Sequence, residues 1–423
     1  MVAAPIDPKS VGSLRTLLDT MNFAPGLLNP ANSVIPFAEL ENLHFARIVS
    51  LDDLTLDEIR LSGSPRQEYP VYLALLCDFD GDPAEFLNDL VRRAGPGLRR
   101  IFSHCDGFTA GTDLLQWMRD RHQPAATTYV NWRGRSMKQV REEADLRQAI
   151  GSYLQNNAAA LADQSSVQVR AHLRKFVEAE TAAGRLKLTP QPATPWGMKI
   201  GSAVHLIGVG FLIVLLLPIM VLLVLFRIRP LEKRDPEFAP RPDPEHVKQL
   251  AILEDYGVAN QFSALGSLKP GLARRWMLTF ILWVIDWTAR HLYTNGRLAR
   301  VRTIHFAQWI FLDDKKRVFF ASNYDGSLDG YMDDFINKVS FGLNVVFCNG
   351  IGYPTTNWLV ADGAKDEQKF KYFIRRHQLP TQVWYNAHSG MTAADLERNS
   401  RIREGLMAPA LSGDAAREWV QLL

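Results

Sequence analysis

The chain has 423 residues, and its 48 Lys and Arg residues nearly balance its 45 Asp and Glu residues, leaving a formal net charge of +3. This near balance gives no case for nucleic acid as the main partner. The cysteines are Cys77, Cys105 and Cys348, which lie far apart and form no CxxC pair. They indicate neither a disulfide framework nor a zinc site, and a reducing compartment is the simplest expectation.

The N-terminal residues carry no secretory signal. They read MVAAPIDPKS, in which Pro and Asp interrupt the apolar run that such a signal needs. We therefore expect the N-terminal half to stay in the cytoplasm. Residues 1–40 lack hydrophobic periodicity and are predicted to form an irregular arm. A first α+β unit is expected at 41–150, and a helical connector with a Pro-rich linker at 151–200.

A membrane segment is predicted at residues 201–228, because residues 203–226 contain no Asp, Glu, Lys or Arg. At about 1.5 Å per residue, this stretch can cross a bilayer core of about 30 Å. Basic residues cluster directly after it, between 227 and 241, and the positive-inside rule places them in the cytoplasm. Both flanks are then cytoplasmic, which favours a hairpin broken at Pro218 or a tilted monotopic insertion over a straight span.

Residues 229–300 are predicted to hold a charged, Pro-rich linker followed by a second membrane-facing helix. The stretch 275–293 is strongly apolar, and its Trp276, Trp283 and Trp287 are typical of a membrane interface. We expect an amphipathic helix that lies on the membrane surface. The alternative is a core helix between two α+β units.

A second α+β unit is predicted at residues 301–407, followed by a C-terminal tail at 408–423. A mostly antiparallel sheet with helices on one face is expected, and Thr392 is predicted to cap the last helix. The expected strands are 304–312, 317–324, 343–349 and 381–387, and the expected helices are 325–339, 366–377 and 392–406.

The two α+β units repeat the same sequence features in the same order. LHFARIVSLDD at 43–53 corresponds to IHFAQWIFLDD at 304–314, and RHQP at 121–124 corresponds to RHQLP at 376–380. Two copies are too few for a solenoid. They predict a duplicated α+β domain whose halves pack as a pseudo-dimer.

This layout resembles ferredoxin-like halves paired into a dimeric α+β barrel, the superfamily that includes chlorite dismutases and dye-decolourising peroxidases. Dye-decolourising peroxidases carry the string GxxDG, and Gly326-Ser-Leu-Asp329-Gly330 fits it, whereas residues 81–85 of the first unit read GDPAE. The resemblance implies haem as a candidate cofactor, with His305 and Asp329 as cofactor-binding residues.

The candidate catalytic residues lie in the second unit, on predicted strands or on the last helix, and we expect them to converge on one cleft. They are His305, Asn323, Tyr385, His388 and Arg403. His305 corresponds to His44 of the first unit, and a strand histidine can ligate a metal or act as a base near neutral pH. The alternative is a structural histidine that bonds a backbone carbonyl beside the sheet edge.

Oxygen-bearing residues recur at alternate positions where a strand of the second unit passes into a helix. They are Asn323, Asp325, Ser327 and Asp329. This spacing can hold Ca²⁺ or Mg²⁺, with Asp325 as the candidate metal ligand. The alternative is helix capping, because Asp82-Pro83 of the first unit reads as an N-cap followed by Pro at the first helical position.

The chain contains no Walker loop, GxSxG elbow, HExxH, GxGxxG or kinase motif, which argues against ATP, NAD and serine-hydrolase chemistry. A cleft-forming fold with a membrane anchor favours a membrane-anchored protein that acts on or binds a lipid or another apolar small molecule. The reaction class that the resemblance implies is that of a haem-dependent oxidoreductase. The alternative is a non-catalytic module that binds lipid or docks a partner protein at the membrane. The expected location is a bacterial-type inner or cytoplasmic membrane, with both units facing the cytoplasm.

Overall fold

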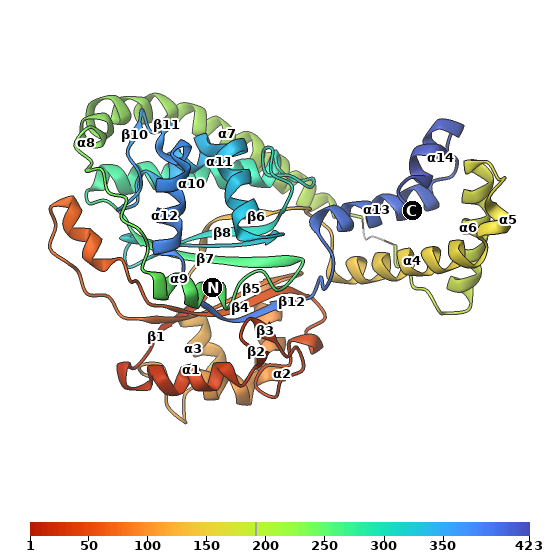
Figure 1. Cartoon of the computed structure of the whole chain (residues 1–423), viewed down its shortest axis with the longest axis horizontal. Coiled ribbons are helices and arrows are strands. Elements are labelled where there is room, and N and C mark those ends of the chain that lie inside the picture. The colour runs from red at the N-terminus through yellow and green to blue at the C-terminus, as the bar shows by residue number, and fades with distance from the viewer. Residues whose placement is uncertain (191–192) are drawn as a thin grey trace. The chain divides into compact units, whose positions relative to one another are not determined.

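The structure is a computed structural model that describes residues 1–190 and 193–423 (Figure 1). The chain divides into two compact units. The larger unit consists of residues 1–133 and 196–390, and the smaller unit consists of residues 134–195 and 391–423. Each unit is therefore built from two separate stretches of the chain.

Within the described residues, the larger unit holds two four-stranded antiparallel sheets. The first sheet has the order β1-β5-β4-β12, and the second sheet has the order β6-β8-β9-β7. The strands of the first sheet are β1 (Val2–Pro5), β4 (Leu43–Leu51), β5 (Tyr72–Phe79) and β12 (Thr381–Asn386). Those of the second sheet are β6 (Ala125–Val130), β7 (Ala259–Ser267), β8 (Ile304–Leu312) and β9 (Arg317–Asp325).

The hairpin of β8 and β9 confirms two of the predicted strands of the second unit, 304–312 and 317–324. Leu312 pairs with Arg317, and the connecting residues Asp313, Asp314 and Lys315 take positive φ angles of 51°, 53° and 61°. Asp tolerates this left-handed region better than most residues, so the sequence DDK suits a tight reversal. Short strand pairs also form between β2 (Asn22–Ala24) and β3 (Leu27–Leu28), and between β10 (Thr356–Asn357) and β11 (Ala361–Asp362).

Each sheet contains one strand that is far in sequence from the other strands of that sheet. β12 pairs with β4, so that Tyr385 lies opposite Ala46, and β6 pairs with β8, so that Tyr129 lies opposite Ala307. The N-terminal stretch therefore completes the second sheet, and the C-terminal stretch completes the first.

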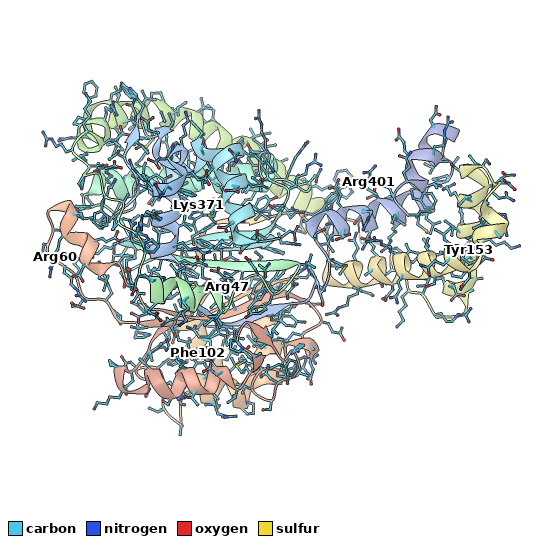
Figure 2. The ribbon with its side chains drawn as sticks, in the orientation of Figure 1. Arg47, Arg60, Phe102, Tyr153, Lys371 and Arg401 are labelled. Atoms are coloured by element: carbon cyan, nitrogen blue, oxygen red, sulfur yellow. The ribbon has the colours of Figure 1, made fainter. Side chains whose placement is uncertain are left out.

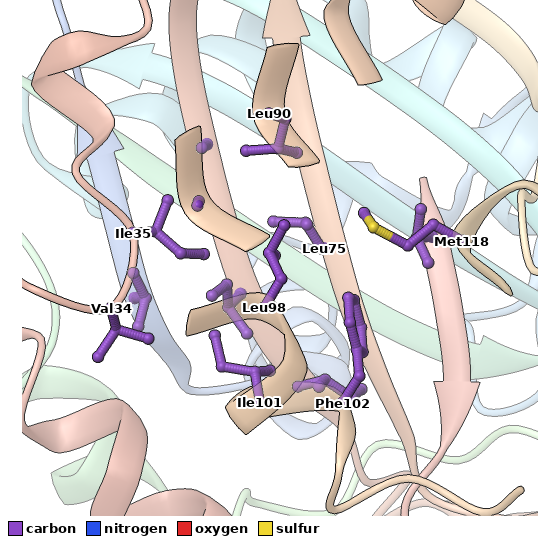
Figure 3. Packing of buried hydrophobic residues seen from close by; sticks show 14 of the residues in the cluster. Val34, Ile35, Leu75, Leu90, Leu98, Ile101, Phe102 and Met118 are labelled. Carbon is purple, nitrogen blue, oxygen red and sulfur yellow. The ribbon is translucent and has the colours of Figure 1, made fainter. Parts of the chain in front are cut away.

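Helices cover the outer face of each sheet, and the two inner faces meet. Against the first sheet, an apolar core includes Phe102 of α2 (Figure 2) and its neighbours Leu98 and Ile101 (Figure 3). A second core lies between the second sheet and its helices, and a third joins Val49 and Leu76 of the first sheet to Ile310 and Phe319 of the second. The helices on the first sheet are α1 (Val11–Asp19), α2 (Pro83–Phe102) and α3 (Leu114–Asp120). Those of the second are α10 (Leu272–His291), α11 (Leu328–Phe347) and α12 (Glu367–His377).

Two predictions from the sequence are wrong. Residues 1–40 are not irregular, because they form β1 and α1. The predicted strand at 343–349 is the last turn of α11 and the loop after it, since α11 runs to Phe347 with a kink at Val339. A short apolar run reads alike for a buried strand and a buried helix, and here the helix continues.

The predicted membrane segment forms one long helix, Trp196–Glu232, made of α7 (Trp196–Leu223), a π turn (Val224–Ile228) and α8 (Arg229–Glu232). It is long and apolar enough to cross a membrane by length and composition, and none of its most apolar window is buried. Pro218 lies inside α7 without reversing it, so the predicted hairpin is wrong. The residues between α8 and β7 include α9 (Pro244–Ala251).

The smaller unit is helical over its described residues, in line with the helical connector that was predicted to begin at residue 151. Its core contains Leu146, Leu173 and Trp419, which come from three different helices. Thr392 forms the predicted N-cap in a capping box with Asp395. The helices are α4 (Met137–Asn156), α5 (Ala158–Leu161), α6 (Ser166–Ala182), α13 (Ala393–Met407) and α14 (Gly413–Val420).

A glycine in α2 tests the packing of the first sheet's helical layer. A Cβ at Gly97 would lie 1.7 Å from the carbonyl oxygen of Val34, whereas a Cβ at Gly95 would meet nothing within 4 Å. We expect Gly97→Ala to lower the free energy of unfolding by about 3 kcal/mol, because backbone on both sides must shift. Gly95→Ala should raise it by about 0.5 kcal/mol through helix propensity. Urea denaturation in detergent measures both, and equal effects of the two variants would contradict this packing.

A buried histidine predicts acid sensitivity. His377 ends α12, its Nδ1 bonds the Phe373 carbonyl oxygen at 2.9 Å, and its ring lies under β7, 2.8 Å from the Cβ position of Gly266. Burial lowers the pKa of His377 to about 4, from 6.5. The unfolded chain therefore binds a proton between these values while the folded chain does not, so stability is lost as the pH falls through that window.

We expect the free energy of unfolding to fall by about 2 kcal/mol between pH 7 and pH 5 from His377 alone. In His377→Gln this part of the pH dependence of the free energy of unfolding should vanish, although the variant is less stable than the unchanged protein at pH 7. Urea denaturation at a series of pH values checks the difference, and parallel slopes for the two proteins would refute it.

Candidate functional site

Arg47 of β4 carries a charge into the space between the two sheets (Figure 2), where its side chain is 2% exposed. Its Nη1 donates to the carbonyl oxygen of Phe262 at 2.6 Å and to Ser263 Oγ at 2.9 Å. Its Nη2 donates to the carbonyl oxygen of Ser322 at 2.9 Å and to Asn323 Oδ1. One side chain of the first sheet thus bonds two strands of the second sheet.

Asp78 of β5 provides the matching negative charge. Its Oδ1 accepts from Gln308 Nε2 at 2.7 Å, and its Oδ2 accepts from Asn323 Nδ2 at 2.9 Å. Asn323 therefore bridges Arg47 and Asp78 with the two ends of one amide. Burial raises the pKa of Asp78, opposed chiefly by the charge of Arg47, and burial lowers the pKa of Arg47 to about 10, opposed chiefly by Asp78.

Three histidines lie beside this pair. His44 Nε2 is 3.0 Å from Asp80 Oδ1, and His44 Nδ1 is 2.9 Å from His388 Nε2. A neutral His44 therefore carries its proton on Nε2, facing the carboxylate, and accepts from His388 at Nδ1. His305 Nε2 is 2.6 Å from Asp325 Oδ1, and its ring centroid is 5.6 Å from that of His388.

The cluster can hold and pass a proton. Asp80 is half-buried, whereas His44 and His388 are buried, so the chain Asp80–His44–His388 runs inward from the surface. The ring of Phe45 lies against both His388 and His305, with centroids 4.7 Å and 5.4 Å away. This packing closes the cluster against solvent.

The structure places two of the five predicted catalytic residues together, His305 and His388, with ring centroids 5.6 Å apart, and it places a third, Asn323, in the network of Arg47 and Asp78. Tyr385 of β12 stacks on Phe37 at 5.3 Å and belongs to the core under α1 and α2. Arg403 lies in α13 of the smaller unit, where its guanidinium is 3.6 Å from Glu142 Oε2.

The predicted cofactor and metal residues have other surroundings. Asp329 is exposed in the first turn of α11, where an acid complements the helix dipole. Asp325 pairs with His305. The described residues contain no group of three or more His, Cys, Asp or Glu side chains placed to hold a metal ion.

The residues around His305 do not fit a haem. The Nε2 atom, which would face the iron, is bonded to Asp325, and the ring packs against Phe45 and His388. The side chain of His305 is 2% exposed, which leaves no face of the ring open to a macrocycle.

Sequence reasoning gave little weight to the first-unit half of this cluster. The repeat matches His44 to His305, but Arg47, Asp78 and Asp80 were not among the predicted site residues. The available indication was Arg47 itself, which is a lone charge inside the apolar strand LHFARIVSL. An ionisable residue in a buried strand needs a partner, so it marks a buried polar network.

Comparison with known proteins adds no assignment. No family model matches the chain, no curated protein matches its sequence, and no solved structure matches its fold.

The Arg47–Asp78 pair can be tested by removing one charge or both. Arg47→Met leaves Asp78 buried without its cation, and we expect the free energy of unfolding to fall by about 3 to 5 kcal/mol. The double variant Arg47→Met/Asp78→Leu should recover most of this loss, because no uncompensated charge remains.

Arg66→Met provides the matched control, since Arg66 forms surface ion pairs with Asp57 at 3.3 Å and with Glu68 at 3.0 Å. It should cost no more than about 1 kcal/mol. Urea denaturation in detergent measures all three proteins. Equal losses for Arg47→Met and Arg66→Met would show that the buried network does not hold the sheets together.

Proposed function

We propose that this protein is a monotopic membrane protein, which lays α7 and α10 in the plane of the cytoplasmic leaflet and binds lipid there. The observation that carries the proposal is the partial burial of α7. Its half-buried positions recur at helical spacing and form one stripe. They are His205, Val209, Ile213, Leu216, Met220 and Leu223.

The opposite face of α7 is also apolar, and it is exposed. Phe211 is 69% exposed, and Ile207, Val214 and Leu222 are exposed beside it. A helix that is apolar all round is normally buried, so a face of this size calls for a lipid environment. Trp276 of α10 and Phe341 of α11 extend the exposed apolar surface.

The contacts of α7 favour an in-plane position over a straight span. Near its start, His205 Nδ1 is 2.8 Å from His291 Nε2, and Trp287 Nε1 donates to the Leu206 carbonyl oxygen at 3.2 Å. Gly210 allows this close approach, because a Cβ there would lie 3.1 Å from the ring of Trp287.

The far end of the long helix is also attached. Ile228 is fully buried, and Glu232 accepts from Thr356 Oγ1 and Leu359 N, each at 2.7 Å. A spanning α7 would pull α10 and the polar loops beside it into hydrocarbon, where unpaired backbone groups are costly. An in-plane helix leaves both flanks on the same side, in line with the basic residues after position 226.

We further propose that the larger unit is a pseudo-dimer of two repeated ferredoxin-like halves. The strand orders β1-β5-β4-β12 and β7-β9-β8-β6 support this, because each half supplies three adjacent strands and exchanges its last one. His44 and His305 then occupy equivalent places, as do Asp80 and Asp325, and each histidine pairs with its own acid.

An enzyme acting on lipid is the second candidate, and the chain Asp80–His44–His388 favours it. A histidine oriented by a carboxylate is a common general base. If the protein is an enzyme, His44→Gln should abolish turnover of the lipid, while Phe23→Ala, which changes an exposed side chain of β2, should leave it unchanged. Turnover that survives His44→Gln would remove His44 as the general base, and no turnover in the unchanged protein would leave lipid binding as the function.

Membrane attachment is tested on the outer face of α7. We expect Phe211→Glu/Leu215→Glu/Leu222→Glu to move the protein from the membrane to the soluble fraction and to lower its affinity for phosphatidylcholine vesicles at least tenfold, because three charges cannot enter hydrocarbon. Vesicle flotation measures the change.

The matched control places the same charges on apolar residues that are exposed elsewhere in the larger unit, in Phe23→Glu/Leu54→Glu/Val258→Glu. This variant should float like the unchanged protein. Cysteines introduced at Arg60 and Lys365, both exposed, should react with an impermeant maleimide from the same side of the membrane. Labelling from opposite sides would establish a straight span and end the in-plane proposal.

A further inference from the structure

Two adjoining cavities open where α10 begins. Their volumes are about 250 Å³ and about 160 Å³. Ser62, Lys269, Pro270 and Ile351 line both, so the two cavities form one basic groove. Ser62 belongs to the short helix η3 (Leu56–Ser62), which lies near the Arg60 label in Figure 2.

The groove is strongly cationic. Six Lys and Arg side chains line it, against one acid, Asp235. The six are Arg234, Lys269, Arg274, Arg275, Lys315 and Lys316. Such an excess of positive charge in a concave site attracts anions.

Two of these cations share a single carboxylate, and they are the buried Arg274 and Lys269, whose side chain is 11% exposed. Lys269 Nζ lies 2.7 Å from Asp235 Oδ2, and Arg274 Nη2 lies 2.7 Å from the same atom. Burial lowers the pKa of Lys269, and Asp235 acts in the opposite direction. One buried positive charge therefore stays uncompensated by side chains, and a second anion would compensate it.

The backbone at this point also suits an anion. Gly271 is the N-cap of α10, with φ of 107°, and provides no side-chain cap. The amides of the first turn thus point outward at the positive end of a 20-residue helix. Separately, the Oγ of Ser267 is buried without a hydrogen-bond partner, and Ser267 lines the second cavity. A buried hydroxyl normally finds a partner, so this one points to a missing ligand oxygen.

We propose that the basic groove binds a phosphate group, carried by the headgroup of an anionic phospholipid. The proposal rests on the membrane attachment proposed above, because the exposed Leu272 and Trp276 of α10 bring the apolar face to the edge of the groove. The headgroup phosphate meets Arg275, Lys315 and Lys316 first, since Lys315 and Lys316 are exposed and Arg275 is half-buried. Its oxygens then accept from the first turn of α10 and from Ser267.

The test compares the full chain with Arg275→Gln/Lys315→Gln/Lys316→Gln on vesicles of phosphatidylcholine alone and of phosphatidylcholine with phosphatidylglycerol. We expect the unchanged protein to bind the anionic vesicles at least tenfold more tightly, and the variant to lose this preference while it still binds phosphatidylcholine. Lys9→Gln/Arg15→Gln/Arg100→Gln removes the same charge from exposed positions in the helical layer of the first sheet, and should keep the preference.

Further arms separate the sources of the phosphate. Ser267→Ala, which changes no charge, should weaken anionic-vesicle binding alone. A titration with inorganic phosphate is monitored by tryptophan fluorescence. If this titration saturates and the unchanged protein shows no preference for anionic vesicles, the groove binds soluble phosphate and not a lipid headgroup. The site would be overturned if both triple-Gln variants lost the preference for anionic vesicles equally. It would also be overturned if the unchanged protein showed neither this preference nor a saturating phosphate titration. Failure to bind any vesicle would instead overturn the membrane attachment, and the phosphate titration would still report on the groove.

Discussion

The guanidinium of Arg47 is the constraint on which the larger unit depends. A permanent charge that is 2% exposed must fill its donors with protein acceptors, and the carbonyls of Phe262 and Ser322 belong to the facing sheet. The first sheet can therefore meet the second in only one register. The apolar contacts of Val49 and Ile310 stabilise the packing of the two sheets but do not fix their relative position. The directional hydrogen bonds of Arg47 fix that position.

Local patterns predicted the local elements well. The hairpin of β8 and β9, helix α12 and the N-cap at Thr392 depend on turn chemistry, hydrophobic spacing and a capping box, all of which lie within a few residues. The strand predicted at 343–349 was wrong because the apolar run at 345–348 within LNVVFCN fits both a strand and the buried end of α11. No periodicity within seven residues can decide between these.

Non-local pairings set the limit for the candidate site. β1 was missed because a four-residue edge strand shows no pattern of its own until it pairs with β5. His305, Asn323 and His388 were predicted as polar residues of the second unit, and the fold places His305 beside His388 and Asn323 beside Asp78. Arg403 was expected beside them because it follows on the next helix, yet that helix belongs to the smaller unit, and sequence order gives no warning of such a division.

In the proposed pseudo-dimer, the two halves exchange β6 and β12, and the stretch of chain between the halves contains the apolar helix α7. Because β6 completes the second sheet and β12 completes the first, neither half has its full set of hydrogen-bonded strands until the other is present. The stretch that joins the halves includes α7, so both must lie on the same side of any bilayer for the exchange to occur. A straight crossing by α7 would separate β4 from β12 and leave long unpaired edges. The strand pairings and the partial burial of α7 are independent observations, and both favour a helix that rests in the membrane plane.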